Sequence, residues 1–135
     1  MVDLNVMADK IKTTLQTVSG IKQAYDYEPQ NMSQLPAATL YFDGFSQSEK
    51  TTRRSSINWQ WTVRIYVPIN TSDIKVPQQE IRNLIYDSIK QLRSDLSLGG
   101  TCLFNTVSSG EVFAMLEQTN PLMVAELTLV ATTED

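Results

Sequence analysis

The residues that could carry chemistry are few, because the 135-residue sequence has no histidine and one cysteine, Cys102. The lack of histidine removes Ser-His-Asp and Cys-His catalysis, a histidine acid or base, and any zinc site that includes histidine. Cys102 could be a nucleophile, but no histidine can activate it, and its neighbours Leu103 and Phe104 are apolar. We therefore expect a buried, inert thiol that forms no internal disulfide.

Three carboxylates, Asp26, Glu28 and Asp43, could bind a divalent ion or act as acid and base. They flank predicted turns, where acidic residues are common because their side chains bond the local backbone. The chain also lacks the glycine-rich phosphate loops GxxxxGK[ST] and GxGxxG. We therefore expect no catalytic residue, no metal and no cofactor, and a binding or structural role in place of an enzyme.

A second group of polar residues lies in the stretch 46–56, which contains no aliphatic residue and separates two apolar segments. We interpret this stretch as a long hairpin that projects beyond the core. Its charged residues could contact a partner, or they could be a solvated loop tip, because isolated surface charges contribute little. The charged residues are Glu49, Lys50, Arg53 and Arg54.

The element that must position these residues is the segment from Ile57 to Val67, in which apolar and polar residues alternate without a break. Such alternation predicts a strand with one buried face, and both tryptophans, Trp59 and Trp61, fall on the apolar parity. We expect them in the core, although an aromatic partner-binding surface is the alternative. Arg64 and Tyr66 fall on the opposite parity, and Arg and Tyr are favoured at protein contacts. They are candidates for a subunit interface, or for an ordinary exposed face.

The other elements follow from the spacing of apolar residues. Helices are predicted over residues 2–18 and 77–93, with Gly20 as a left-handed cap of the first. Strands are predicted over 21–27 and 37–43, with a bulge or bend at Gly44, and a closing hairpin over 106–117 and 122–132. In the last arm Val124 and Val130 lie on the otherwise polar parity, which suggests a second contact surface.

This order of elements predicts an α+β domain: about five strands in a largely antiparallel sheet, with two helices on one face. The strand order is not determined by the pattern. The length suits a single domain spanning residues 1–135. The net charge of −4 argues against general nucleic-acid binding. No apolar run is long enough for a membrane span, and the N-terminus lacks the pattern of a secretory signal, so we expect neither.

The motifs, taken in order, resemble the tail terminator or tail completion proteins of tailed bacteriophages. They are IKQAYDYEP (21–29), LPAATLYFDGF (35–45), WTVRIYVP (61–68), LGGTC (98–102), GEVF (110–113) and the closing strand 122–131. The resemblance covers almost the whole chain, although each motif alone consists of strand-forming residues and turns.

The resemblance implies a virion protein without enzymatic activity, located at the head-proximal end of the tail and present in the host cytoplasm during assembly. It implies a homo-oligomeric ring, expected to be a hexamer, that caps the tail tube, stops its elongation and joins it to the head connector. The 46–56 hairpin would face the ring's partner or its lumen, and DNA would only pass through. A head completion or neck protein is one alternative, and a small carboxylate-based enzyme or ligand-binding domain is another.

Overall fold

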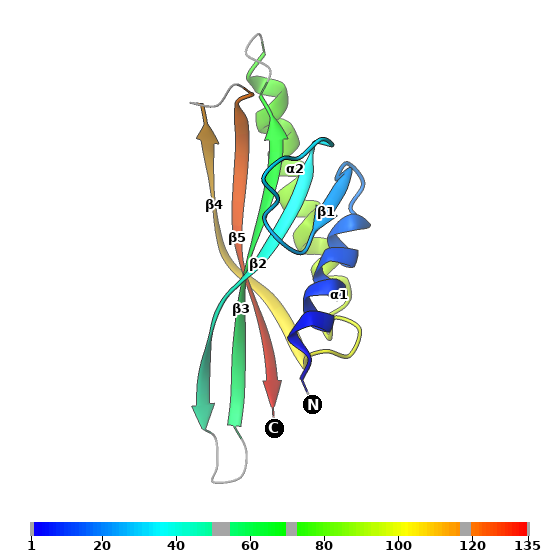
Figure 1. Ribbon diagram of the computed structural model, residues 1–135, viewed down its shortest axis with the longest axis vertical. Helices are drawn as coiled ribbons and strands as arrows, with labels where there is room; N and C mark the ends of the chain where they lie inside the picture. Colours follow the sequence, from blue (N-terminus) through cyan, green and yellow to red (C-terminus); the bar gives the residue numbers. More distant parts are fainter. Residues whose placement is uncertain (1, 50–54, 70–72, 117–119, 135) are drawn as a thin grey trace.

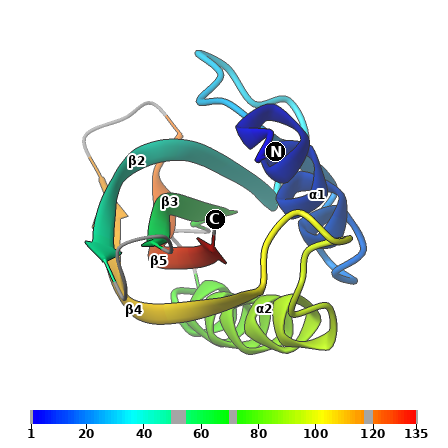
Figure 2. The same ribbon diagram turned by 90° about the horizontal axis from the view of Figure 1, so that it is seen from below.

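The computed structural model of the chain describes residues 2–49, 55–69, 73–116 and 120–134. These residues form one five-stranded sheet in the order β1-β2-β3-β5-β4 with two helices against one face (Figures 1 and 2). The predicted α+β class with a largely antiparallel sheet is confirmed. The elements are α1 (Leu4–Gln16), β1 (Gln23–Tyr25), β2 (Ala37–Glu49), β3 (Ser55–Pro68), α2 (Lys75–Ser94), β4 (Phe104–Met115) and β5 (Leu122–Glu134).

Both helices form where apolar residues recur at helical spacing, and both bury that stripe on the sheet. Asp3 caps α1 by accepting hydrogen bonds from the backbone of Asn5 and Val6 at 3.0 and 3.2 Å. Gly20, with φ +104°, follows the helix in the left-handed region, as predicted. On α2, Ile85 and Ile89 continue the apolar spacing but are only half-buried. The buried residues of α2 are Pro77, Ile81, Leu84, Ser88 and Leu92.

The predicted central strand is β3, which lies between β2 and β5 and pairs antiparallel with both. On its apolar parity Val63, Ile65 and Val67 are fully buried and Trp61 nearly so, whereas Trp59 is half-buried. The prediction of core packing is therefore correct for Trp61 and only partly correct for Trp59.

Strand β2 extends further than predicted, because its pairing with β3 continues from Ala37 opposite Tyr66 to Glu49 opposite Ser55. The register shifts between Phe42 and Gly44, so the bulge predicted at Gly44 is present. The hairpin tip, residues 50–54, lies outside the described residues, and its projection stays a prediction. Strand β1 is short and pairs parallel with the start of β2, which is the one departure from an antiparallel sheet. None of the described helices is both long and apolar enough to span a membrane.

Candidate interaction surface

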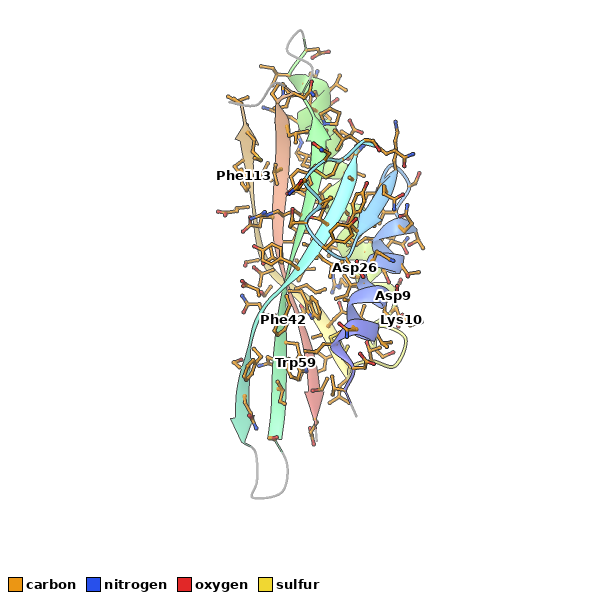
Figure 3. All side chains as sticks on the ribbon, in the orientation of Figure 1. Asp9, Lys10, Asp26, Phe42, Trp59 and Phe113 are labelled. Carbon is orange, nitrogen blue, oxygen red and sulfur yellow. The ribbon has the colours of Figure 1, made fainter. Side chains whose placement is uncertain are left out.

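The acidic residues singled out in the sequence do not converge on one site. Asp43 accepts a hydrogen bond from Gln60 at 2.8 Å, Asp26 is exposed on a loop, and Glu28 lies against the sheet (Figure 3). Within the described ranges no three His, Cys, Asp or Glu residues are grouped so that they could hold a metal ion.

The single thiol is inert in this fold. Cys102 is buried, and its Sγ lies 3.6 Å from the carbonyl oxygen of Leu96. Burial, together with the negative charge of Asp95, raises the pKa of the Cys102 thiol to about 11. Little thiolate therefore forms at neutral pH, which agrees with the predicted inert thiol.

The clearest polar network joins the 26–36 loop to the sheet face opposite the helices. Glu28 accepts hydrogen bonds from the hydroxyls of Thr39 and Tyr66, the latter at 2.9 Å. Arg64 donates from Nε to Glu126 at 3.0 Å, and its Nη1 lies 3.8 Å from Glu28. One arginine thus bridges two carboxylates from different parts of the chain.

The electrostatics of this network favour the charged arginine and the neutral phenol. Burial raises the pKa of Tyr66, and the negative charge of Glu28 raises it further. Burial alone would lower the pKa of Arg64, but hydrogen bonds with Tyr66 and Glu126 outweigh burial and hold that pKa above its ordinary value. The network is therefore a fixed structural contact at neutral pH, with the Tyr66 phenol as donor to Glu28.

Two of the four residues predicted at a subunit interface, Tyr66 and Val124, are buried within the chain, and the prediction is wrong for these two. Tyr66 and Val124 are 6% and 0% exposed, because they form a small apolar cluster with Leu122 that Met32 and Leu35 cover. The 26–36 loop, which carries Met32 and Leu35, folds over the sheet face opposite the helices. Neither Tyr66 nor Val124 therefore has surface to offer a neighbour. Arg64 is engaged with Glu28 and Glu126, and Val130 is only partly exposed.

Two apolar surfaces are exposed on the described residues. Part of the first corresponds to the aromatic alternative for Trp59 and Trp61, whereas the sequence reasoning missed the second. The first, here called the aromatic surface, consists of Phe42, Phe45 and Trp59 on the paired strands β2 and β3, where Phe45 lies opposite Trp59. Figure 3 shows Phe42 and Trp59 on this part of the sheet. Phe45 is 63% exposed, and its ring centroid lies 5.7 Å from that of Trp59. Phe42 is 43% exposed and packs at 5.2 Å on the buried Trp61. Phe42 continues the apolar parity of β2, whereas Phe45 falls on the opposite parity and reaches the same face because the register shifts between Phe42 and Gly44. Alternation alone therefore could not place Phe45 on this surface.

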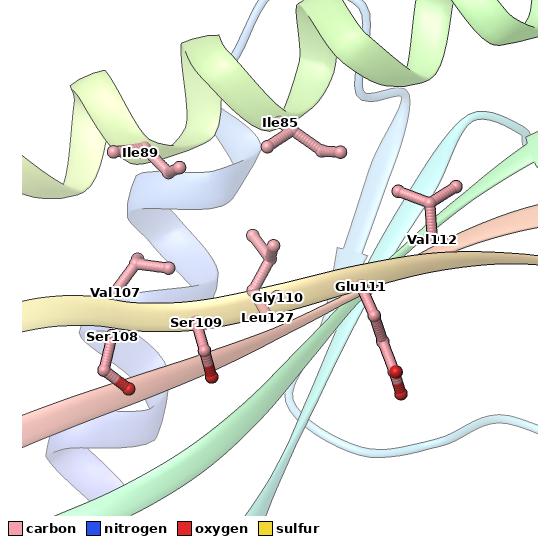
Figure 4. A pocket seen from close by; sticks show the side chains of 9 residues that line it. All are labelled: Ile85, Ile89, Val107, Ser108, Ser109, Gly110, Glu111, Val112 and Leu127. Carbon is pink, nitrogen blue, oxygen red and sulfur yellow. The ribbon is translucent and has the colours of Figure 1, made fainter.

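The second surface, here called the edge surface, is strand β4 with the groove between β4 and α2 (Figure 4). Its exposed apolar residues are Val112, Phe113 and Leu116. The groove is lined by half-buried Ile85 and Ile89 on one side and by Val107, Val112 and Leu127 on the other. The groove has a volume of ≈ 290 Å³ and a mainly apolar lining, so it could receive an apolar side chain.

The charged residues predicted to contact a partner are not placed by the structure. Lys50, Arg53 and Arg54 lie outside the described residues, as does the side chain of Glu49, the last residue of β2. Their role stays a prediction. In the comparison with known proteins, no family model matches the chain and no curated protein matches it.

Proposed function

We propose that the protein is a structural component of a phage tail, forming a homo-oligomeric ring, of six copies by the resemblance, that caps the tail tube. The observation that supports this proposal most is the pair of exposed apolar surfaces at different ends of one small domain. Phe45 on the aromatic surface and Leu116 on the edge surface are each more than 60% exposed. Large apolar side chains exposed to this degree on neighbouring positions favour a site of protein contact.

The two surfaces differ in shape, and this difference favours a ring over a twofold dimer. The aromatic surface presents large rings that stand out from a hairpin, whereas the edge surface presents a strand beside a groove. A contact between unlike surfaces is heterologous, and heterologous contacts close into rings or continue as filaments. The proposed cap of the tail tube corresponds to the closed ring.

The partners in this proposal are further copies of the chain, the tail tube protein on one ring face and the head connector on the other. DNA is passing cargo, and the net charge of −4 disfavours tight binding to it. The hairpin residues Glu49, Lys50, Arg53 and Arg54 are the proposed contacts to the tube or lumen. Six linked copies would convert a weak contact into a firm one.

The test combines mass, capture and morphology. Light scattering should report a mass several times 15.2 kDa, and immobilised tail tube protein should retain the purified protein. Particles made without this protein should carry overlong tails in electron micrographs. Retention by the head connector protein alone, with tails of normal length, would assign the chain to head completion and refute the proposed cap.

A further inference from the structure

We propose that β4 of one copy pairs with β2 of the next, and that Phe45 of that neighbour enters the groove between α2 and β4. This inference rests on the proposed function, since it names the contact that would join copies within the ring. Of the predicted interface residues, Tyr66 and Val124 cannot contribute to it, because they are buried within their own chain.

Both ends of the sheet present an open strand edge. Among the described residues β4 pairs only with β5, and β2 is covered by β1 only at residues 37–39. The outer edge of β2 is therefore open over residues 40–49. Each of the two strands contains one irregularity, which leaves regular stretches at 109–115 in β4 and 44–49 in β2. Such edges carry backbone donors and acceptors ready to pair with another strand.

The strand directions suit pairing between copies that point the same way. Each step from β2 to β3, β5 and β4 is antiparallel, so β2 and β4 run in opposite directions within one chain. When a second copy continues the sheet in the same orientation, its β2 lies antiparallel to the first copy's β4. A cyclic ring requires this common orientation. After this pairing the two joined copies still have one unpaired β2 edge and one unpaired β4 edge, so a further copy can add in the same way.

The side chains on these edges also match across the proposed contact. Phe45 pairs in register with Trp59 and Val112 pairs with Ala125, which places both Phe45 and Val112 on the helix-covered face of the sheet. A neighbouring β2 would therefore direct Phe45 to the side on which α2 lies. There the groove between Ile85 and Val112 is open and apolar (Figure 4). An exposed aromatic ring and an unfilled groove are thus carried by the same chain.

The area available favours an individually weak contact. The shorter regular stretch, 44–49 in β2, limits the pairing to six residues, which span about 20 Å. With α2 beside the strand, the edge is about 20 Å thick, so it presents about 400 Å² per copy. The total of about 800 Å² lies below the usual size of a stable interface and in the range of weak contacts. Assembly should therefore depend strongly on protein concentration, with the closure of the ring adding to each single contact.

The test uses two edge variants and a matched control. Val112→Lys places a charge at the β4 groove, and Phe45→Lys removes the ring that should enter it. Both side chains are exposed, so the fold should be retained, as circular dichroism would verify. Tyr86→Lys changes a 66% exposed aromatic residue of α2 in the same way and serves as the control. Sedimentation velocity over a concentration series gives the mass of each protein.

We expect the wild type and Tyr86→Lys to assemble, and each edge variant alone to stay at 15.2 kDa. An equimolar mixture of the two edge variants should form a dimer of one copy each, because one good edge of each kind remains. Assembly of either edge variant alone like the wild type, or the absence of the mixed dimer, would overturn the proposed pairing while leaving a ring through other contacts possible. A monomeric wild type would overturn the ring and the pairing together. Assembly as expected without capture by tail tube protein would refute the function alone.

Discussion

The loop that closes the second face of the sheet is anchored by one side chain, and Glu28→Ala should release it. Glu28 accepts hydrogen bonds from Thr39 and Tyr66 and lies near Arg64. The hydroxyl of Thr39 belongs to a fully buried residue, so without Glu28 it would be left without its acceptor. The same loop carries Met32, which covers the Tyr66 cluster.

The magnitude follows from these contacts. A hydrogen bond to a charged group contributes about 1.5–3 kcal/mol, and a buried donor left unpaired costs about 1–3 kcal/mol. The Glu28 side chain is about a third exposed and its ion pair with Arg64 is long at 3.8 Å, so we expect that pair to contribute little to the free energy of unfolding. We expect Glu28→Ala to lower the free energy of unfolding by about 2–4 kcal/mol, since the two hydrogen bonds do not add fully.

Urea unfolding followed by tryptophan fluorescence measures this change as a shift of the midpoint at constant slope. Glu28 accepts from Thr39 through Oε1 and from Tyr66 through Oε2, and Glu28→Gln keeps only one of these two acceptor oxygens. It should therefore lower the free energy of unfolding by about half as much as Glu28→Ala. Asp26→Ala removes an exposed carboxylate from the same loop and should change the free energy of unfolding by about 0.5 kcal/mol at most. Equal stability of Glu28→Ala and Asp26→Ala would refute the anchoring role.

Three further predictions concern single residues. Asn105→Ala should lower the free energy of unfolding by about 2–3 kcal/mol in thermal or urea melts, because the buried amide Nδ2 bonds the carbonyls of Leu92, Asp95 and Leu96 at the end of α2. Unchanged stability would contradict this cap. The Cys102 thiol should react with a disulfide reagent at pH 8 about 100-fold more slowly in the folded than in the urea-unfolded protein, because its raised pKa leaves little thiolate; equal rates would contradict its burial. Phe45→Ser should change the free energy of unfolding of the dilute monomer by about 0.5 kcal/mol at most, since the ring is mostly exposed, whereas a large loss in urea melts would place Phe45 in the monomer core.

The parts of the fold that the sequence predicts are those with a regular period. The alternation in β3, the helical spacing in α1 and α2, and the glycine at the β2 bulge each identify an element. Together they predict the α+β class, because two amphipathic helices and a sheet with one apolar face bury their apolar residues when the helices pack on that face.

The parts that the sequence does not predict depend on contacts between distant residues. The burial of Tyr66 follows from a loop more than thirty residues away that carries Glu28 and Met32. Asn105 caps α2 from the start of β4, which no local pattern indicates. The parallel pairing of β1 with β2 likewise depends on a connection through the 26–36 loop, and the sequence pattern left the strand order undetermined.

The aromatic surface shows most clearly what an alternating pattern omits. Strand β3 has fourteen residues and is about 48 Å long, whereas the twenty residues of α2 span about 30 Å. Burial on the apolar parity falls from Val63, fully covered, to Trp59, which packs against the margin of the core and is half-covered. The parity pattern carries no information on where the helical cover becomes incomplete, so it does not distinguish Trp59 from the fully buried residues. If nothing else covered this margin, a polar residue would be expected opposite Trp59, yet the mostly exposed Phe45 occupies that position. An exposed aromatic side chain at the margin of the core is explained when a neighbouring copy covers it, as pairing of β2 with the next β4 would do.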